Sequence, residues 1–252
     1  MSRTPRKHSE SGIYHIMLRG INKQQIFYDD EDFRYFIRLL QRYKKLCRYE
    51  LHAYCLMGNH IHLLIRENEV PLEIIFRHIG SAFVYWYNRK YDRTGHLFQD
   101  RYKSEPVNDR RYYLTVLRYI LQNPVAAGLC LSPEEYPYSS AREYISGKHG
   151  ITDIQFALEF PEAGTLKNYI SQESDDRCLE MAESVRSYCP DERARKLILQ
   201  ELGTFSPTAG KAKERQALNH SIRLLKEAGI SIRQLSRLTG LSKKIIETAL
   251  RQ

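Results

Sequence analysis

Two histidines one residue apart, His60 and His62, are the feature that most constrains the fold of this chain. They lie in residues 57–65, MGNHIHLLI, where apolar residues fill the alternate positions. In a β-strand, alternate side chains point to the same face. The pattern therefore predicts a strand with both imidazoles on one face and Ile61 and Leu63 packed into a core on the other.

The residues before the pair predict the other half of a β-hairpin. Residues 51–57, LHAYCLM, are β-prone, and Gly58-Asn59 is a two-residue connection of the kind that closes hairpins through positive φ angles. We expect two antiparallel strands with His60 and His62 just after the turn. Such a pair serves either as two metal ligands or as ordinary strand histidines, and the strand alone leaves both interpretations open.

Further elements alternate around this hairpin. A strand at residues 13–18 and a helix ending near Lys45 precede it, and a helix beginning after Pro71 and a strand at residues 101–107 come after it. The order β-α-β-β-α-β predicts an α+β fold of the ferredoxin-like, split-βαβ type with an antiparallel sheet. We expect helices on one face of the sheet and an open second face that carries a site.

A third helix, expected over residues 110–122, places a phenol beside a carboxamide. Tyr119 and Asn123 are four residues apart and are therefore neighbours on a helix. In isolation this arrangement also fits a half-buried tyrosine followed by a helix-ending asparagine. The next residue on the histidine face of the strand is Leu64, so a third metal ligand has to come from elsewhere, and the Asn123 amide oxygen is a candidate.

The predicted ligand set suggests both a metal and a reaction. Two imidazole nitrogens and one amide oxygen suit Mg²⁺ or Mn²⁺, with phosphate oxygens completing the coordination shell. A tyrosine aligned on a metal-bound phosphate gains as a nucleophile and forms an aryl phosphodiester. Because that ester conserves bond energy, such a site favours cutting and rejoining of DNA strands over simple digestion.

Charge divides the chain into three parts. The 252 residues carry a net charge of +9, which divides into +7 over residues 1–150, −5 over residues 151–204 and +7 over residues 205–252. Two basic parts around an acidic one indicate two polyanion-binding surfaces, although an ordinary solvated basic face has the same composition. We predict domains with these boundaries, the middle one an acidic helical connector.

The last of these parts predicts a helix-turn-helix. Helices expected at residues 217–228, 231–238 and 243–250 are separated by Gly229 and by the turn 239–242. Lys243 and Lys244 fall in the first turn of the last helix, where the helix dipole disfavours cations and a DNA phosphate would compensate. A small helical packing module is the alternative.

Other classes of protein are disfavoured. No apolar run approaches the ~20 residues that span a bilayer, and no apolar stretch follows the basic N-terminal residues. The five cysteines are scattered, which favours a reducing compartment. The sequence therefore predicts a cytoplasmic protein without a membrane partner.

Four segments together resemble one family. Residues 57–64, MGNHIHLL, resemble the HUH motif of single-tyrosine transposases, in particular the REP-associated tyrosine transposases. Similar matches, in the order typical of the family, are AYCLM at 53–57, RTGHLFQDRYKS at 93–104 and RYILQNPVAAG at 118–128. Gly58 stands where members often have proline, and residues 19–22 read Arg-Gly-Ile-Asn in place of Arg-Gly-Asn.

The resemblance implies a metal-dependent endonuclease and strand transferase that acts on single-stranded DNA at or near hairpins. By similarity, His60, His62 and Asn123 would be the metal ligands. Tyr119 would be the nucleophile, forming a 5′-phosphotyrosine and releasing a 3′-hydroxyl. Residues 1–150 would be the catalytic domain, and a homodimer is possible.

The expected DNA contacts lie on basic strands, loops and the last helix. They are Arg19, Lys23, Arg101, Lys103, Lys243 and Lys244. Two rival functions remain open. One is a DNA-binding regulator whose transposase core is inactive, and the other is a water-using metal phosphodiesterase in which Tyr119 only orients the substrate.

Overall fold

The computed structural model describes residues 6–147, 150–160, 166–172, 178, 191–203 and 212–251. The chain forms two compact units, one of residues 1–26 and 32–185 and the other of residues 186–252 and 27–31. We call the first of these the sheet unit and the second the helical unit.

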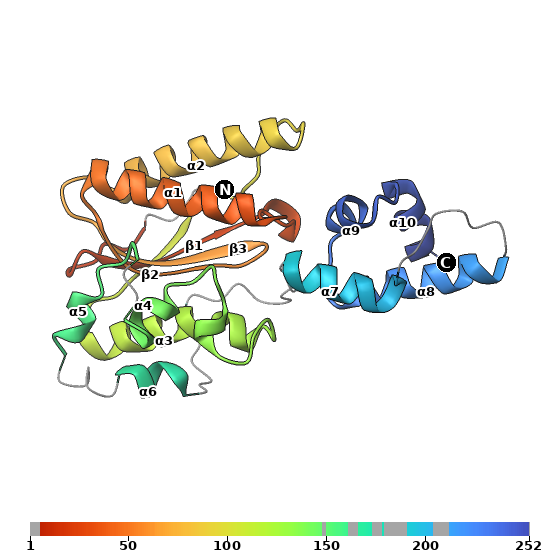
Figure 1. The fold of residues 1–252 in the computed structure, drawn as a ribbon. Coiled ribbons are helices and arrows are strands. Elements are labelled where there is room, and N and C mark those ends of the chain that lie inside the picture. Colours follow the sequence, from red (N-terminus) through yellow and green to blue (C-terminus); the bar gives the residue numbers. More distant parts are fainter. Residues whose placement is uncertain are drawn as a thin grey trace. The chain divides into compact units, whose positions relative to one another are not determined.

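The sheet unit has the predicted order of elements up to α3. The α+β prediction with an antiparallel sheet is confirmed, since the four strands lie in the order β2-β3-β1-β4 and all neighbours are antiparallel (Figure 1). The elements are β1 (Ile13–Arg19), the 3₁₀ turn η1 (Ile21–Lys23), α1 (Asp30–Cys47), β2 (Glu50–Leu56), β3 (His60–Arg66), α2 (Leu72–Lys90), β4 (Lys103–Pro106) and α3 (Arg110–Ala126).

Helices cover both faces of this sheet. α1 and α2 lie on one face and α3 on the other (Figure 1). The expectation of an open second face is therefore wrong. That face carries apolar residues such as Cys55 and Leu64, both fully buried, and their burial under α3 is favourable. This packing brings the helix that carries Tyr119 onto the histidine face.

The hairpin between β2 and β3 does not use the expected turn. Neither Gly58 nor Asn59 has a positive φ angle. Instead, the Gly20 N–H donates to the Asn59 carbonyl (2.9 Å) and the Ile26 N–H donates to the Gly58 carbonyl (2.8 Å). Within the hairpin the Met57 N–H donates to the His60 carbonyl (2.8 Å), and the segment after β1 adds these two hydrogen bonds from outside.

α3 is longer than predicted. It continues through Pro124 to Ala126, whereas the sequence predicted an end at Gln122. Proline removes only one intrahelical donor, and the Asn123 and Pro124 carbonyls still accept from the backbone N–H groups of Ala127 and Leu129. Asn123 is therefore held in helical geometry one turn after Tyr119.

The predicted connector, residues 151–204, does not form a separate unit. Its short helices α5 (Gln155–Leu158) and α6 (Leu166–Ser171) belong to the sheet unit together with η2 (Pro133–Glu135) and α4 (Ala141–Ile145), while α7 (Asp191–Leu202) belongs to the helical unit. Leu166 and Ile170 of α6 are buried, and α6 packs on α3. Burial of these apolar side chains favours the packing of α6 on α3.

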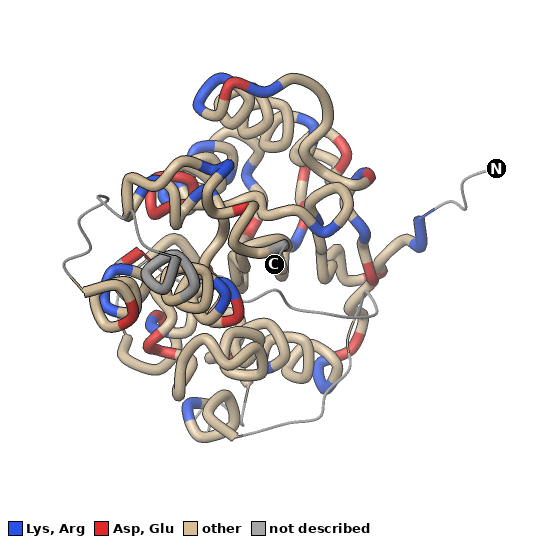
Figure 2. Tube along the Cα trace, turned by 90° about the vertical axis from the view of Figure 1, so that its right-hand side faces the viewer, with Lys and Arg blue, Asp and Glu red and all other residues tan. Residues whose placement is uncertain are grey.

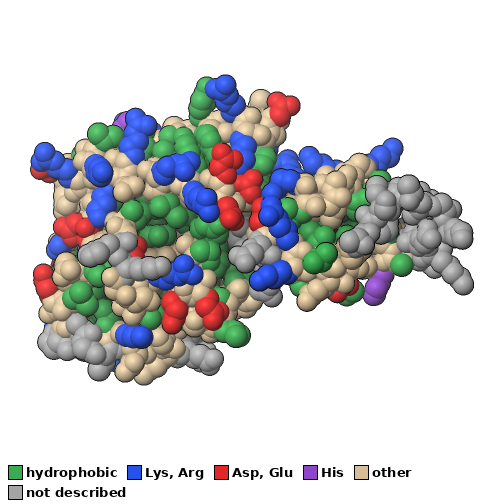
Figure 3. All heavy atoms as spheres, in the orientation of Figure 1, with side chains coloured by type: hydrophobic (Ala, Val, Ile, Leu, Met, Phe, Trp, Pro, Cys, Tyr) green, Lys and Arg blue, Asp and Glu red, His purple; other side chains and the backbone are tan. Residues whose placement is uncertain are grey.

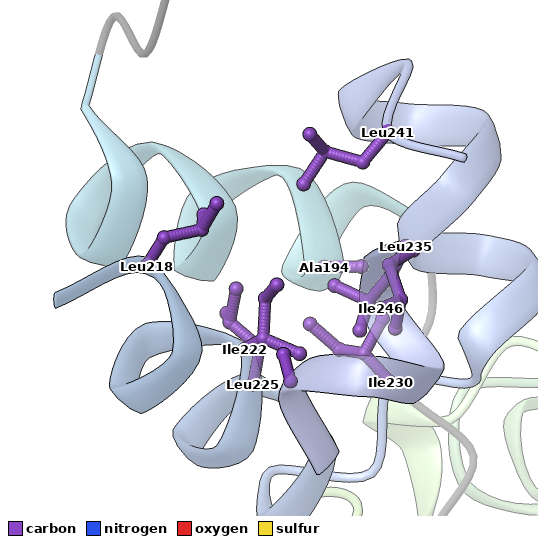
Figure 4. Packing of buried hydrophobic residues seen from close by; sticks show 9 residues of the cluster. Ala194, Leu218, Ile222, Leu225, Ile230, Leu235, Leu241 and Ile246 are labelled. Atoms are coloured by element: carbon purple, nitrogen blue, oxygen red, sulfur yellow. The ribbon is translucent and has the colours of Figure 1, made fainter. Parts of the chain in front are cut away.

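The helical unit consists of α7, α8 (Ala212–Glu227), α9 (Ile232–Thr239) and α10 (Lys243–Arg251) around one aliphatic core. Ile222 of α8, Leu235 of α9 and Ile246 of α10 point into this core (Figure 4). The Ser231 hydroxyl caps α9, and Gly240, with φ of 74°, ends it. A short connection leads to α10, and DNA binding by this pair stays a prediction.

No helix in the described part of the chain is long and apolar enough to cross a membrane.

Candidate active site

The structure brings the four predicted catalytic residues together between β3 and α3. His60 Nε2 lies 3.3 Å from Asn123 Oδ1. The His62 ring lies edge-on to the Tyr119 ring, with 5.5 Å between the centroids. The two imidazoles are 5.0 Å apart and nearly perpendicular. The two histidines share a face because side chains alternate along β3, and Tyr119 and Asn123 are neighbours because they are one turn apart on α3. Packing of α3 on the sheet brings the two pairs together.

A hydrogen bond defines which nitrogen of His60 faces the site. His60 Nδ1 lies 2.7 Å from Asn59 Oδ1, and the Asn59 amide donates to the Lys23 carbonyl at 3.4 Å. Because Asn59 presents its oxygen, His60 Nδ1 carries the proton and donates it. The Nε2 lone pair of a neutral His60 therefore faces the Asn123 oxygen.

In this tautomer of His60, two acceptor atoms face each other, an arrangement that a bound cation would stabilise. Nε2 and Oδ1 have no proton to share as long as His60 is neutral. Ligands about 2.1 Å from a metal and about 100° apart are separated by roughly 3.2 Å, close to the observed 3.3 Å. The donor set therefore fits one divalent cation held by His60 and Asn123, with His62 beside them.

Burial keeps these imidazoles neutral. It lowers the pKa of His60 to about 4, to which the nearby positive charge of Arg19 also contributes, while the Asn123 oxygen opposes the shift because it would accept a hydrogen bond from the protonated ring. Burial also lowers the pKa of His62 well below its usual value. Neutral imidazoles keep the lone pair that a metal ligand needs.

A third histidine at the site was missed by the sequence analysis. His15 of β1 is fully buried, and its Nε2 lies 2.9 Å from His62 Nδ1. Its ring also lies edge-on to Tyr119, with 5.8 Å between centroids. The strand at residues 13–18 was predicted, but its pairing with β3 was not. Only that pairing shows that His15 shares a face with His62.

The neighbouring amide on α3, Gln122, points elsewhere. It is buried, and its amide nitrogen donates to the carbonyls of Ile170 (2.5 Å) and Gln172 (3.3 Å). A rotation of about 100° per residue separates it from Asn123 on the helix. Gln122 is therefore a structural amide, whereas Asn123 is the candidate ligand.

In the described part of the chain, no three His, Cys, Asp or Glu side chains are grouped as a metal cluster.

The predicted DNA-binding residues do not form one group. Arg19 pairs directly with His60 in the sheet, and Lys103 opens β4. Arg101 precedes β4, so the predicted strand over residues 101–107, which would have placed Arg101 and Lys103 on one face, begins too early. Lys23 lies in η1.

Lys243 and Lys244 are exposed on α10 of the helical unit. Across the described chain, Lys and Arg are scattered among acidic residues and do not form one continuous stripe (Figure 2). On the face shown in Figure 3, basic side chains of the sheet unit surround apolar patches.

A family model matches the segment of the chain that carries the predicted site residues. Residues 8–123, which include both predicted histidine ligands, Tyr119 and Asn123, match the family model described as "Transposase IS200 like". This segment of the chain belongs to that transposase family. DNA transposition is the process that this membership supports. No curated protein sequence matches the chain.

The transposase fold extends beyond the matched segment. The structure is similar to one described as "Structure of the REP associates tyrosine transposase bound to a REP hairpin". The TM-score is 0.53 at 17% sequence identity, and the match covers 73% of this chain and 99% of that chain. At this identity the likeness concerns the fold alone.

Proposed function

We propose that this transposase is a metal-dependent endonuclease and strand transferase for single-stranded DNA. In this proposal it acts at or near DNA hairpins through a 5′-phosphotyrosine intermediate during DNA transposition. The observation that carries the proposal is the convergence of His60, His62 and Asn123 beside Tyr119. A phenol beside a set of cation-binding donor atoms is suited to catalysis of phosphoryl transfer, whereas a protein that only binds DNA does not need this arrangement.

The chemistry of the chain's own residues can be derived from this geometry. The Tyr119 hydroxyl oxygen attacks the scissile phosphorus and loses its proton, and the bond from phosphorus to the 3′-oxygen breaks. The products are a 5′-phosphotyrosine and a 3′-hydroxyl end that gains a proton. The reverse attack by a 3′-hydroxyl rejoins the strand without an energy source, because the phosphodiester bond count is unchanged.

His60, His62 and Asn123 would hold Mg²⁺ or Mn²⁺. The bound cation would supply Lewis-acid polarisation of the phosphate and neutralise developing negative charge. His62 packs against the Tyr119 ring, which limits the positions that the phenol can take. Alignment of this kind lowers the entropic part of the barrier.

The test is a Tyr119→Phe substitution assayed with Mn²⁺ and a single-stranded hairpin oligonucleotide on denaturing gels. We expect the wild type to nick the DNA and to form a covalent adduct, and we expect the variant to do neither. Tyr85→Phe is the matched control, since Tyr85 is an exposed tyrosine on α2, which lies on the opposite face of the sheet (Figure 1).

Two outcomes would overturn the proposal. A Tyr119→Phe variant that nicks as fast as the wild type would indicate a water-using phosphodiesterase. A wild-type protein that binds the hairpin but never nicks it would indicate a regulator with an inactive core.

A further inference from the structure

We propose that His15 is a positioning residue for His62. In this proposal, which rests on the metal-dependent function above, His15 accepts a hydrogen bond from His62 Nδ1–H. That bond leaves the Nε2 lone pair of His62 available to the cation, and Glu105 selects the tautomer of His15 that makes it possible.

The sheet places the three side chains in one row. Glu105 of β4 is directly opposite His15 of β1, and His15 is diagonal to His62 of β3, because Met17 is the residue opposite His62. All of these positions share one face of the sheet. His15 is fully buried and the exposed fraction of His62 is 2%, so water cannot replace their contact.

The distances limit how the protons are arranged. His15 Nε2 lies 2.9 Å from His62 Nδ1, and His15 Nδ1 lies 3.9 Å from Glu105 Oε2. A neutral imidazole has one donor nitrogen and one acceptor nitrogen. If His15 donated through Nε2, its Nδ1 lone pair would face a carboxylate oxygen. If His15 accepts through Nε2, its Nδ1–H faces that oxygen, which is electrostatically favourable.

Glu105 is itself held as an acceptor. The Tyr112 hydroxyl is hydrogen-bonded to it. In the described part of the chain, His15 Nδ1 has no hydrogen-bond partner, so the carboxylate at 3.9 Å is the charge that orients it. The order of proton donation is therefore His62 to His15, with the remaining His15 proton directed to Glu105.

His60 has a hydrogen-bond partner of the same kind. Asn59 accepts from His60 Nδ1–H and leaves His60 Nε2 for the cation. Each predicted histidine ligand thus has a partner on Nδ1 that fixes its tautomer and ring orientation. Partners of this kind change metal affinity by about 10–100-fold when they are lost.

The experiment compares three substitutions. His15→Phe keeps a buried ring of similar size but removes the acceptor. His15→Gln places an amide oxygen near the position of Nε2 and restores it. Met17→Leu is the control, because it changes a buried neighbour opposite His62 and leaves the hydrogen bond intact. Circular dichroism establishes that each variant is folded.

Two readouts are measured on the full chain. Long-range ¹⁵N–¹H spectra of the metal-free protein give the protonated nitrogen of His62, and calorimetry gives the affinity for Mn²⁺. We expect His62 to be protonated on Nδ1 in the wild type, His15→Gln and Met17→Leu. We expect His15→Phe to lose this preference and to bind Mn²⁺ about 10–100-fold more weakly, with His15→Gln within about threefold of wild type.

A wild-type His62 protonated on Nε2 would overturn the proposal, as would wild-type Mn²⁺ affinity in folded His15→Phe. If His15→Phe does not fold, Glu105→Gln takes its place, because Glu105 is one-third exposed. This variant tests the same order of proton donation, from His62 to His15 and from His15 toward Glu105. A wild type that binds no Mn²⁺ would count against the metal-dependent function, while the tautomer of His62 would still decide this inference.

Discussion

The sheet unit and the helical unit bury polar groups for different purposes. In the sheet unit, His15 and His62 are buried beside Tyr119 with two of their ring nitrogens 2.9 Å apart, and the buried Asn59 lies against His60. In the helical unit, two of the buried polar groups of the described residues, Ser231 and Gln234, act at helix ends. Ser231 caps α9, and Gln234 donates to Asp191 at the start of α7.

This difference indicates which unit performs chemistry. Burying a polar group destabilises the folded state unless the group is hydrogen-bonded, and burying two facing acceptors with no proton between them destabilises it further. The helical unit places an aliphatic core where the sheet unit places imidazoles. The contrast supports a catalytic role for the sheet unit and a binding or packing role for the helical unit, and three measurements test it.

The largest expected effect separates two adjacent amides of α3. Asn123→Ala removes the oxygen that faces His60 Nε2 and should lower the Mn²⁺ affinity by about 10–100-fold, with a comparable loss of nicking. Gln122→Ala should leave the Mn²⁺ affinity unchanged but lower the free energy of unfolding by about 1–3 kcal/mol, because it removes the donor to the buried Ile170 carbonyl and to the Gln172 carbonyl.

Calorimetry with Mn²⁺ and urea unfolding measure both quantities in the same samples. Equal Mn²⁺ affinities for the two variants would remove Asn123 from the ligand set.

A smaller effect is expected from acid. His15 is fully buried and His60 is half-buried, and both fold as neutral imidazoles with pKa values lowered by burial to about 3 and about 4, whereas in the unfolded chain they titrate near 6.5. Below pH 6.5 the unfolded state therefore binds more protons. Stability contributed by these groups is complete above that pH and is lost toward pH 4, by at most about 1.4 kcal/mol per histidine per pH unit.

The measurement is urea unfolding in EDTA between pH 7.5 and 5. Trp86, the single tryptophan, lies on α2 and reports on the sheet unit by fluorescence. We expect its midpoint to fall with pH, and we expect a shallower fall in His15→Phe, which has one titrating group fewer. A midpoint that stays constant to pH 5 would show that these histidines do not fold as neutral groups.

The smallest effect concerns the helical unit. Lys243 and Lys244 are exposed in the first turn of α10, and replacing both with alanine should weaken binding to duplex DNA only a few-fold at low salt. The slope of log affinity against log salt should decrease by about two. Nicking of single-stranded hairpins by the sheet unit should be unchanged.

Anisotropy with a labelled duplex at several salt concentrations measures this slope. Arg223→Ala with Lys226→Ala on α8 removes the same charge from the same unit and should have the smaller effect on the slope. Equal slopes for the two double variants would show that α10 is not a specific contact surface, and the helical unit would then be a packing module.

Local spacing allowed much of the catalytic site to be predicted. His60 and His62 share a face because a strand has a period of two, and Tyr119 adjoins Asn123 because a helix has 3.6 residues per turn. These relations depend only on neighbouring residues. For the same reason the order of strands and helices in the sheet unit could be predicted from the sequence.

Contacts between segments that are far apart in the sequence could not be predicted from local spacing and are seen only in the folded structure. His15 reaches His62 through the register of β1 against β3, and Gln122 turns from the site to the carbonyls that α6 offers. The turn at Gly58 accepts hydrogen bonds from the segment after β1. Because each of these contacts depends on how segments far apart in sequence pack, no periodicity within one segment could reveal it. Local spacing placed His60, His62, Tyr119 and Asn123 on their elements, and packing joined them and added their partners.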